Sequence, residues 1–197
     1  MPPEVVAAVD DFARETGHDA LLLDQAAAVA CGDSTALDLS QVANNMRIVR
    51  VPKAVVNLGT IETLGLARSV PHTDTESFAH KMATLGERDL KRIDLEGNQM
   101  TEVPEAILAM PRLQSLSLRD NALRRLPPSI AQLGHVLVEL DVRANFLEEL
   151  PEAIGTLRCL RLLSCGRNVL RALPASLGDL TRLVTLWLSH NLSLIHI

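Results

Sequence analysis

Residues 113–133 read LQSLSLRDNALRRLPPSIAQL, and this stretch decides the fold. The same order of leucines, one asparagine and one proline recurs along the chain, with the leading leucine at residues 90, 113, 137, 160 and 183. An internal period of roughly 20–29 residues is typical of solenoids, which stack one repeated structural unit. The sequence therefore predicts an array of stacked units rather than a globule with a single central core.

Within each unit, the alternation LxL predicts a short strand with one buried face, and the later apolar positions bring the chain back over the other side. One unit cannot bury its own apolar edge, so neighbouring units must stack and pair their strands in a parallel sheet. We expect the asparagine after each strand to adopt unusual backbone angles and to bind backbone groups of adjacent turns through its amide. The proline of each unit should fix φ in the return segment. The asparagines and prolines concerned are Asn98, Asn121, Asn145 and Asn168, and Pro104, Pro127, Pro151 and Pro174.

This repeat, LxxLxLxxNxLxxLPxxIxxLxx, resembles the leucine-rich-repeat family. The closest type is the 23-residue intracellular one with the signature LPxxIGxL, which stands here as LPEAIGTL at residues 150–157. Similar arrays occur in Ras-associated scaffolds and in plant intracellular Ras-group repeats. The resemblance implies an α/β solenoid with parallel strands on a concave face that binds a protein partner. By analogy, the partner would be a small GTPase or a phosphatase complex.

The regular repeats span residues 90–191, and residues 37–89 contain an irregular, degenerate version. Its strands are expected at the pairs Leu37/Leu39 and Leu64/Leu66, which lie 27 and 29 residues before the following pair. Seven strands are thus predicted in all. The asparagine is missing or displaced in these units, with Ser69 at the position expected in the second one. The longer second unit predicts an inserted helix with a cap at Asp74 or Thr75, an apolar face and an end at Gly86; the apolar face comprises Phe78, Met82 and Leu85.

Residues 1–36 are expected to form a helical N-terminal cap from two helices, at 3–16 and 19–31, because a solenoid leaves its first core layer open. This segment has seven acidic residues and one arginine, a formal net charge of −6. The whole chain has a formal net charge of −5, so residues 37–197 together carry +1. An acidic interaction motif is the alternative interpretation. Since no basic stripe is present, nucleic acid is not an expected partner.

The last six residues, 192–197, read LSLIHI and break the repeat, because Ser193 stands where the next apolar position is due. The stretch looks like one reading frame of a transposase adapter used in sequencing libraries. We therefore interpret residues 192–197 as a non-native tail and expect the natural protein to continue beyond Asn191.

The sequence offers no sign of catalytic or metal chemistry. It contains no phosphate loop, dinucleotide-binding glycine motif, zinc-spaced Cys/His cluster or nucleophile elbow, so we expect no enzyme activity, catalytic residue, metal ligand or cofactor. Cys159 and Cys165 are interpreted as buried, inert thiols. Without paired cysteines, a secretory signal or an apolar run of about 18 residues, a cytoplasmic protein that does not enter membranes is expected.

Function must then come from strand residues that point away from the core. Arg119 and Arg143 occupy the same place in successive units, so they should lie about 5 Å apart, with acidic residues such as Asp94 and Asp141 to balance them. The alternative is a solvated, charge-compensated surface. Trp187 is either a binding residue or a side chain that packs on a missing cap. The candidate partner-binding residues are Asp94, Glu96, Arg119, Asp141, Arg143, Arg167 and Trp187.

Three classes of function follow from these observations. The leading hypothesis is an intracellular scaffold that binds a protein on its concave sheet. The alternative is the recognition domain of a larger, truncated enzyme such as a kinase, GTPase, phosphatase, cyclase or ubiquitin ligase; sequence beyond Asn191 would discriminate the two. A purely structural solenoid is the third, and it predicts that charge reversal at Arg119 and Arg143 leaves all partner binding unchanged.

Overall fold

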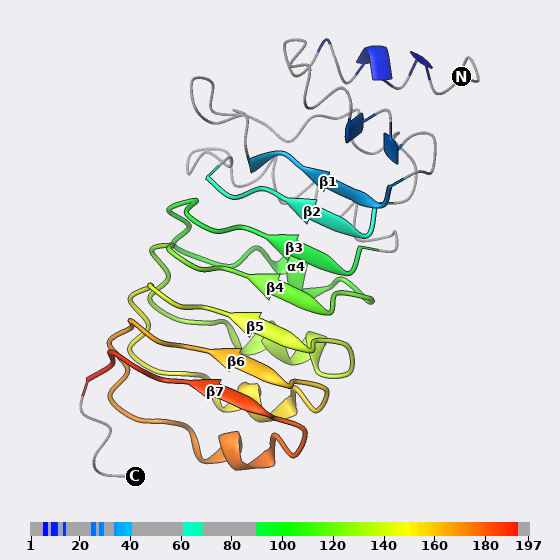
Figure 1. The fold of residues 1–197 in the computed structure, drawn as a ribbon. Helices are drawn as coiled ribbons and strands as arrows, with labels where there is room; N and C mark the ends of the chain where they lie inside the picture. Colours follow the sequence, from blue (N-terminus) through cyan, green and yellow to red (C-terminus); the bar gives the residue numbers. More distant parts are fainter. Residues whose placement is uncertain are drawn as a thin grey trace.

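The chain was studied as a computed structural model. The structure describes residues 6–7, 9–11, 14, 25–26, 28–29, 34–40, 61–68 and 90–192. Within these ranges, seven three-residue strands form one parallel sheet in the order of the sequence, each strand paired with the next (Figure 1). The strands are β1 Ala36–Asp38, β2 Thr63–Gly65, β3 Arg92–Asp94, β4 Ser115–Ser117, β5 Glu139–Asp141, β6 Leu162–Ser164 and β7 Thr185–Trp187.

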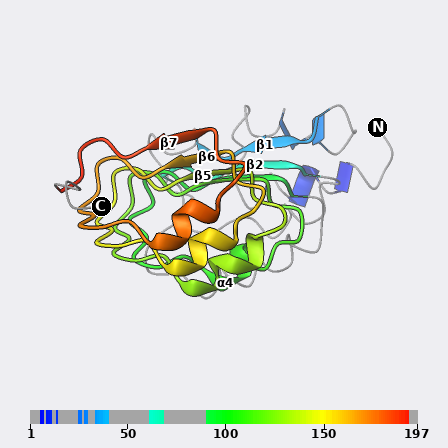
Figure 2. The ribbon, with the colours of Figure 1, turned by 90° about the horizontal axis from the view of Figure 1, so that it is seen from below.

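Short helical turns cover the other side of the sheet. They are α4 Glu105–Leu108 and the 3-10 turns η3 Pro128–Leu133, η4 Glu152–Thr156 and η5 Ala175–Asp179. Figure 2 shows them in one row opposite the strands. A proline precedes each turn with φ between −62° and −71°, as the sequence predicted for the return segment. The fold is an α/β leucine-rich-repeat solenoid, and the prediction of seven strands is confirmed.

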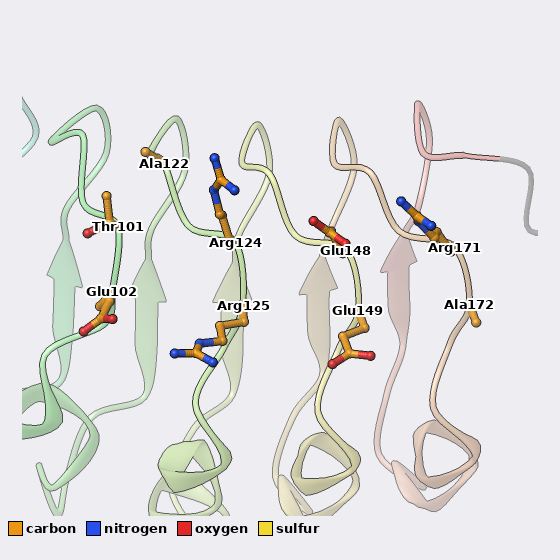
Figure 3. A pocket seen from close by; sticks show the side chains of 9 residues that line it. All are labelled: Thr101, Glu102, Ala122, Arg124, Arg125, Glu148, Glu149, Arg171 and Ala172. Atoms are coloured by element: carbon orange, nitrogen blue, oxygen red, sulfur yellow. The ribbon is translucent and has the colours of Figure 1, made fainter.

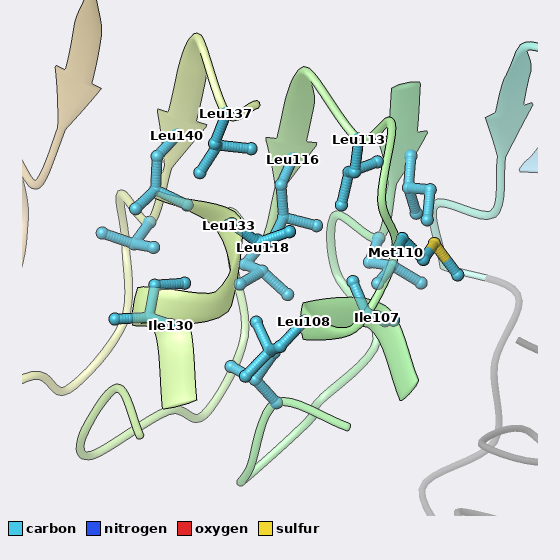
Figure 4. Packing of buried hydrophobic residues seen from close by; sticks show 14 of the residues in the cluster. Ile107, Leu108, Met110, Leu113, Leu116, Leu118, Ile130, Leu133, Leu137 and Leu140 are labelled. Carbon is cyan, nitrogen blue, oxygen red and sulfur yellow. The ribbon is translucent and has the colours of Figure 1, made fainter. Parts of the chain in front are cut away.

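Aliphatic side chains fill the space between the sheet and the helical turns. The middle residue of each strand from β1 to β6 points inward and is at most 2% exposed. In successive units, Leu116 and Leu140 lie side by side and face Ile130 and Leu133 of the intervening turn (Figure 4). Because each unit contributes only one thin layer, every layer is sealed by its two neighbours, and burial is worth roughly 1.5–3 kcal/mol for each such side chain.

The degenerate units obey the same register. Leu37 pairs with Leu64, and Leu64 pairs with Ile93, so β1 and β2 lie where the LxL pairs predicted them. Between these two units, the Ser40 hydroxyl accepts a hydrogen bond from the Ala67 amide at 2.9 Å. Ser69 and the inserted helix expected at 74–86 lie outside the described residues.

Most of the two N-terminal helices expected at 3–16 and 19–31 also lies outside the described residues, but the residues described there are helical. Ala26 and Val29 are buried in the core next to the first units. The Gln25 side-chain carbonyl accepts a hydrogen bond from the Asp38 amide at 2.8 Å, so this segment contacts the edge strand β1. At the other end, the layer of β7 is more open, with Leu186 38% and Val184 73% exposed.

The asparagines form a ladder of buried amides. Asn121 accepts hydrogen bonds from the amides of Asn98 at 3.1 Å and Met100 at 2.9 Å, both in the preceding unit. It donates to the carbonyl of Leu95 in that unit and to the carbonyl of Leu118 in its own. The equivalent asparagines repeat this arrangement, so each one joins two units; they are Asn98, Asn145, Asn168 and Asn191.

The expectation that these asparagines adopt unusual backbone angles is wrong. The residue before each asparagine has positive φ instead, between 53° and 69°. The asparagine is left in ordinary backbone geometry, with its amide directed at its partners. The residues with positive φ at this position are Gly97, Asp120, Ala144, Arg167 and His190, and Arg68 holds the same place in the second unit. Only glycine adopts this conformation without steric cost, because a Cβ crowds the following carbonyl.

Ala144 therefore stores strain that glycine would relieve. We expect Ala144→Gly to raise the free energy of unfolding by about 1 kcal/mol, measured by urea denaturation. The matched control is Ala122→Gly, two residues after Asp120, at a position without positive φ. There the more flexible unfolded chain should lower the free energy of unfolding by about 0.4–1 kcal/mol. Equal destabilisation by both changes would show that the backbone of the ladder turn is not left-handed at Ala144.

Candidate functional site

The sheet face that points away from the core, here called the concave face, carries two rows of side chains. One row comes from the first residue of each strand and the other from the third, because alternate residues of a strand point to the same face. The first row is Arg92, Ser115, Glu139, Leu162 and Thr185, and the second is Asp94, Ser117, Asp141, Ser164 and Trp187. The strand register therefore brings residues more than 90 positions apart in the sequence onto one surface.

A hollow of about 340 Å³ lies on this face over strands β4 to β7. We call it the concave hollow. Three of the predicted binding residues line it: Asp141, Arg143 and Trp187. The other lining residues are Ser115, Leu116, Ser117, Glu139, Leu162 and Ser164. Polar groups, one ion pair, the half-buried Leu162 and the exposed Trp187 thus surround a shallow concavity, as in binding sites for protein segments.

Asp141 and Arg143 form the most closely bonded charge pair of the concave hollow. The Arg143 Nε donates to both carboxylate oxygens of Asp141 at 3.0 Å, and its Nη2 donates to Oδ2 at 2.5 Å. This hydrogen bonding raises the pKa of Arg143 above its ordinary value. The Arg143 side chain is 38% exposed and the Asp141 side chain is 20% exposed, so the pair can still contact a partner. Because the guanidinium is already oriented, less conformational entropy is lost when it binds.

Arg119 has a different partner from the one expected. Its Nη1 lies 3.8 Å from the Glu96 carboxylate, and Glu96 also lies 3.8 Å from Arg68. Asp94, which was expected to help balance the arginines, instead accepts a hydrogen bond from the Glu96 amide at 3.0 Å. The prediction of charge balance on this face was therefore right for Asp141 and wrong for Asp94.

The strand-end aspartates also have a structural task. Asp38, Asp94 and Asp141 each accept a hydrogen bond from the amide two residues further on, at 2.8–3.0 Å. Such Asx turns satisfy an amide where the chain leaves the sheet. Arg167 lies apart from the concave hollow, because it occupies the left-handed position of its ladder turn with φ 55°. Of the seven predicted residues, the structure thus brings three together in the hollow and places Asp94, Glu96, Arg119 and Arg167 outside it.

Sequence reasoning missed the first row of the concave face. Glu139 and Leu162 precede the middle leucine of their strands, and the same alternation that selected Asp141 would have selected them. The Ser115 hydroxyl donates to the Glu139 carboxylate at 3.0 Å across the β4–β5 pair. Trp187, at the far end of the hollow, is 52% exposed. The missed residues add an acidic group and an aliphatic surface beside the predicted ones.

The two described cysteines differ in environment. Cys165 is fully buried, and burial raises the pKa of its thiol from 9.0 to about 12, with a smaller contribution from the charge of Asp141. The expectation of a buried thiol is wrong for Cys159, which is only partly buried; its thiol donates to the carbonyl of His135 at 3.2 Å. In the described part of the chain, no cluster of His, Cys, Asp and Glu side chains could hold a metal ion.

Comparison with known proteins agrees with this geometry. Residues 112–133 match the family model described as Leucine Rich Repeat. The fold is that of leucine-rich-repeat proteins. A leucine-rich-repeat protein from Leptospira interrogans superposes with a TM-score of 0.72 and 30% identity, over 86% of this chain and 40% of that one. No curated protein sequence matches.

Two plant receptors are also similar in structure. The peptide hormone receptor RGFR1, solved in complex with RGF2, gives a TM-score of 0.56 at 28% identity, over 67% of this chain and 21% of that one. The second is the ectodomain of the receptor kinase GASSHO1/SCHENGEN3 from Arabidopsis thaliana, solved in complex with Casparian strip integrity factor 2. It gives a TM-score of 0.56 at 23% identity, over 72% of this chain and 17% of that one. The present chain therefore spans less than half the length of each of these three neighbours. No helix in its described part has the length and apolar character needed to span a bilayer.

The environments of the cysteines lead to a labelling prediction. Burial keeps the Cys165 thiol protonated and away from solvent, so below pH 9.0 a disulfide reagent should not react with Cys165 in the native chain, whereas it can reach the partly buried Cys159. Cys159→Ser should remove one reactive thiol from the native protein, whereas Cys165→Ala should remove none until denaturant is added. Because the folded-state pKa of Cys165 is raised, its burial stabilises the fold up to pH 9.0, and this contribution is lost as the pH rises towards about 12. Equal labelling rates at the two thiols in the native state would contradict this placement.

Proposed function

We propose that the chain is a protein-interaction module that binds its partner in the concave hollow. The observation that carries the proposal is this hollow itself, in which strands β4 to β7 combine an ion pair, hydroxyl groups, the half-buried Leu162 and the exposed Trp187. In this proposal, Asp141, Arg143 and Trp187 make the central contacts. Asp94, Glu96, Arg119 and Arg167 lie outside the hollow and would contact parts of the partner that extend beyond it.

The chemistry of the hollow suits an extended segment of a protein. Leu162 and Trp187 supply apolar surface, and a tryptophan is among the residues that most often dominate binding energy. Glu139 and the Asp141–Arg143 pair offer both signs of charge, which favour specificity more than affinity. One neighbour of similar fold, the receptor RGFR1, was solved in complex with RGF2, and this supports a peptide-like partner.

We further propose a scaffold role inside the cell. The support for it is the LPxxIGxL signature at residues 150–157, which resembles the intracellular type of repeat. On the same resemblance, small GTPases and phosphatase complexes are the first partners to test. The recognition domain of a larger enzyme would use the same concave face, so this alternative differs only in what is attached to the repeats.

The experiment selects binders from a displayed library of natural protein fragments on the immobilised chain and measures their affinity for variants. Arg143→Glu and Trp187→Ser should each weaken binding at least about tenfold, or about 1.4 kcal/mol. The matched control, Gln132→Glu, changes an exposed residue of turn η3 on the convex side and should leave affinity unchanged. If no recovered binder distinguishes Arg143→Glu, Trp187→Ser or a combined Arg119→Glu/Arg143→Glu variant from the control, the concave face is not the binding site.

A further inference from the structure

A second charged surface lies at the side of the solenoid, away from the concave hollow. It is formed by the segments that lead from the ladder turns to the convex helical turns, and it encloses a hollow of about 630 Å³. We call it the lateral face. Figure 3 shows its side chains projecting from four successive units. The lining residues are Thr101, Glu102, Ala122, Arg124, Arg125, Glu148, Glu149, Arg171 and Ala172.

The charges of the lateral face alternate from unit to unit. Glu102 forms the first stripe, and the second stripe consists of Arg124 and Arg125. The third stripe consists of Glu148 and Glu149, and Arg171 forms the fourth. The order is thus acidic, basic, acidic, basic, with one charge in each outer stripe and two in each inner stripe, so the face carries no net charge.

These six side chains are exposed and uncommitted within the chain. Among the residues that the structure describes, the ion pairs of up to 4.0 Å include none of them. Opposite charges therefore lie in adjacent units without direct contact, which leaves their hydrogen-bonding groups open to a partner.

We propose that the lateral face binds a second copy of this chain in an antiparallel arrangement. Reversing the order acidic, basic, acidic, basic gives basic, acidic, basic, acidic. Each stripe of one copy then faces a stripe of opposite charge on the other. This self-association is independent of what the concave hollow binds.

The geometry of the repeats fits a twofold axis between the second and third stripes. Such an axis makes the contact isologous, with Arg124 facing Glu148 and Arg125 facing Glu149 in both directions. Both copies repeat at the same strand spacing of roughly 5 Å, so the register holds across all four stripes. A parallel arrangement would instead place like charges opposite each other, which is unfavourable.

An exposed aromatic residue next to the stripes fits the same arrangement. Phe146 is 58% exposed and follows its ladder asparagine as Ala122 does in the preceding unit. The twofold axis that exchanges the second and third stripes also places Phe146 of one copy opposite Ala122 of the other. A large apolar side chain thus meets a small one, which adds buried apolar area to charge pairs that individually contribute little.

Sedimentation velocity of the whole chain, from about 1 µM to about 1 mM, tests the proposal across the range where weak complexes become populated. In about 0.1 M salt we expect reversible dimers. In about 1 M salt, where screening acts within roughly 3 Å, the dissociation constant should rise at least about tenfold. Phe146→Ser should also weaken the dimer.

Charge reversal locates the interface. Arg124→Glu/Arg125→Glu and Glu148→Arg/Glu149→Arg should each be monomeric, because like charges then face each other in the inner stripes. An equimolar mixture of the two variants should dimerise again, since every stripe in the mixed pair meets its opposite. Formation of the mixed dimer also shows that both variants are folded.

Three results would overturn the proposal. The first is a wild-type chain that stays monomeric at every concentration in low salt. The second is a dimer that survives either reversal, as association through the exposed Val184 and Leu186 would. The third is a mixture of the two variants that remains monomeric while circular dichroism shows both to be folded.

Discussion

The buried side-chain amide of each ladder asparagine is the interaction on which the rest of the structure depends. In Asn121, one carboxamide joins three backbone groups of the preceding unit and two of its own. A buried backbone group left without a partner costs roughly 1–3 kcal/mol, so a turn that lost its asparagine would leave several such costs uncompensated. The leucines supply most of the burial energy, but apolar contacts alone have no direction. The amides set the spacing and register at which the leucine layers meet.

The concave face follows from that register. Once neighbouring units are locked together, the first and third residues of every strand fall into rows, and Glu139, Leu162 and Trp187 come onto one surface although they are far apart in sequence. The aspartates at the strand ends serve both the turn and the surface. Asp141 caps its turn and orients Arg143 at the same time. Function and stability therefore share residues on this face, whereas the charged side chains of the lateral face are exposed and take no part in the core.

The repeat period predicted the path of the backbone but not which partners the long side chains contact. All seven strands could be predicted, even in the degenerate units, because Leu37 and Leu64 keep the LxL spacing that a one-sided strand requires. The left-handed residue was placed one position too late, since asparagine tolerates that conformation and hydrogen bonds elsewhere in the turn decide which residue adopts it. The choice between Glu96 and Asp94 as the partner of Arg119 depends on reach and rotamer, which periodicity does not encode. The exposure of Cys159 depends on how the convex turns pack, and the repeat pattern has no position reserved for it.

The most direct test of this account is native-state hydrogen exchange at the amides that donate to the ladder. The amides of Leu123 and Leu147 lie in turns, outside the sheet, and bind the side-chain oxygens of Asn145 and Asn168 at 3.0 Å. If the ladder holds the units together, these amides exchange only when the array unfolds, with the same protection as the Leu118 amide that binds Asp141 in the sheet. If they exchange by local opening while the sheet amides stay protected, the ladder is an accessory to the leucine core and does not set its register.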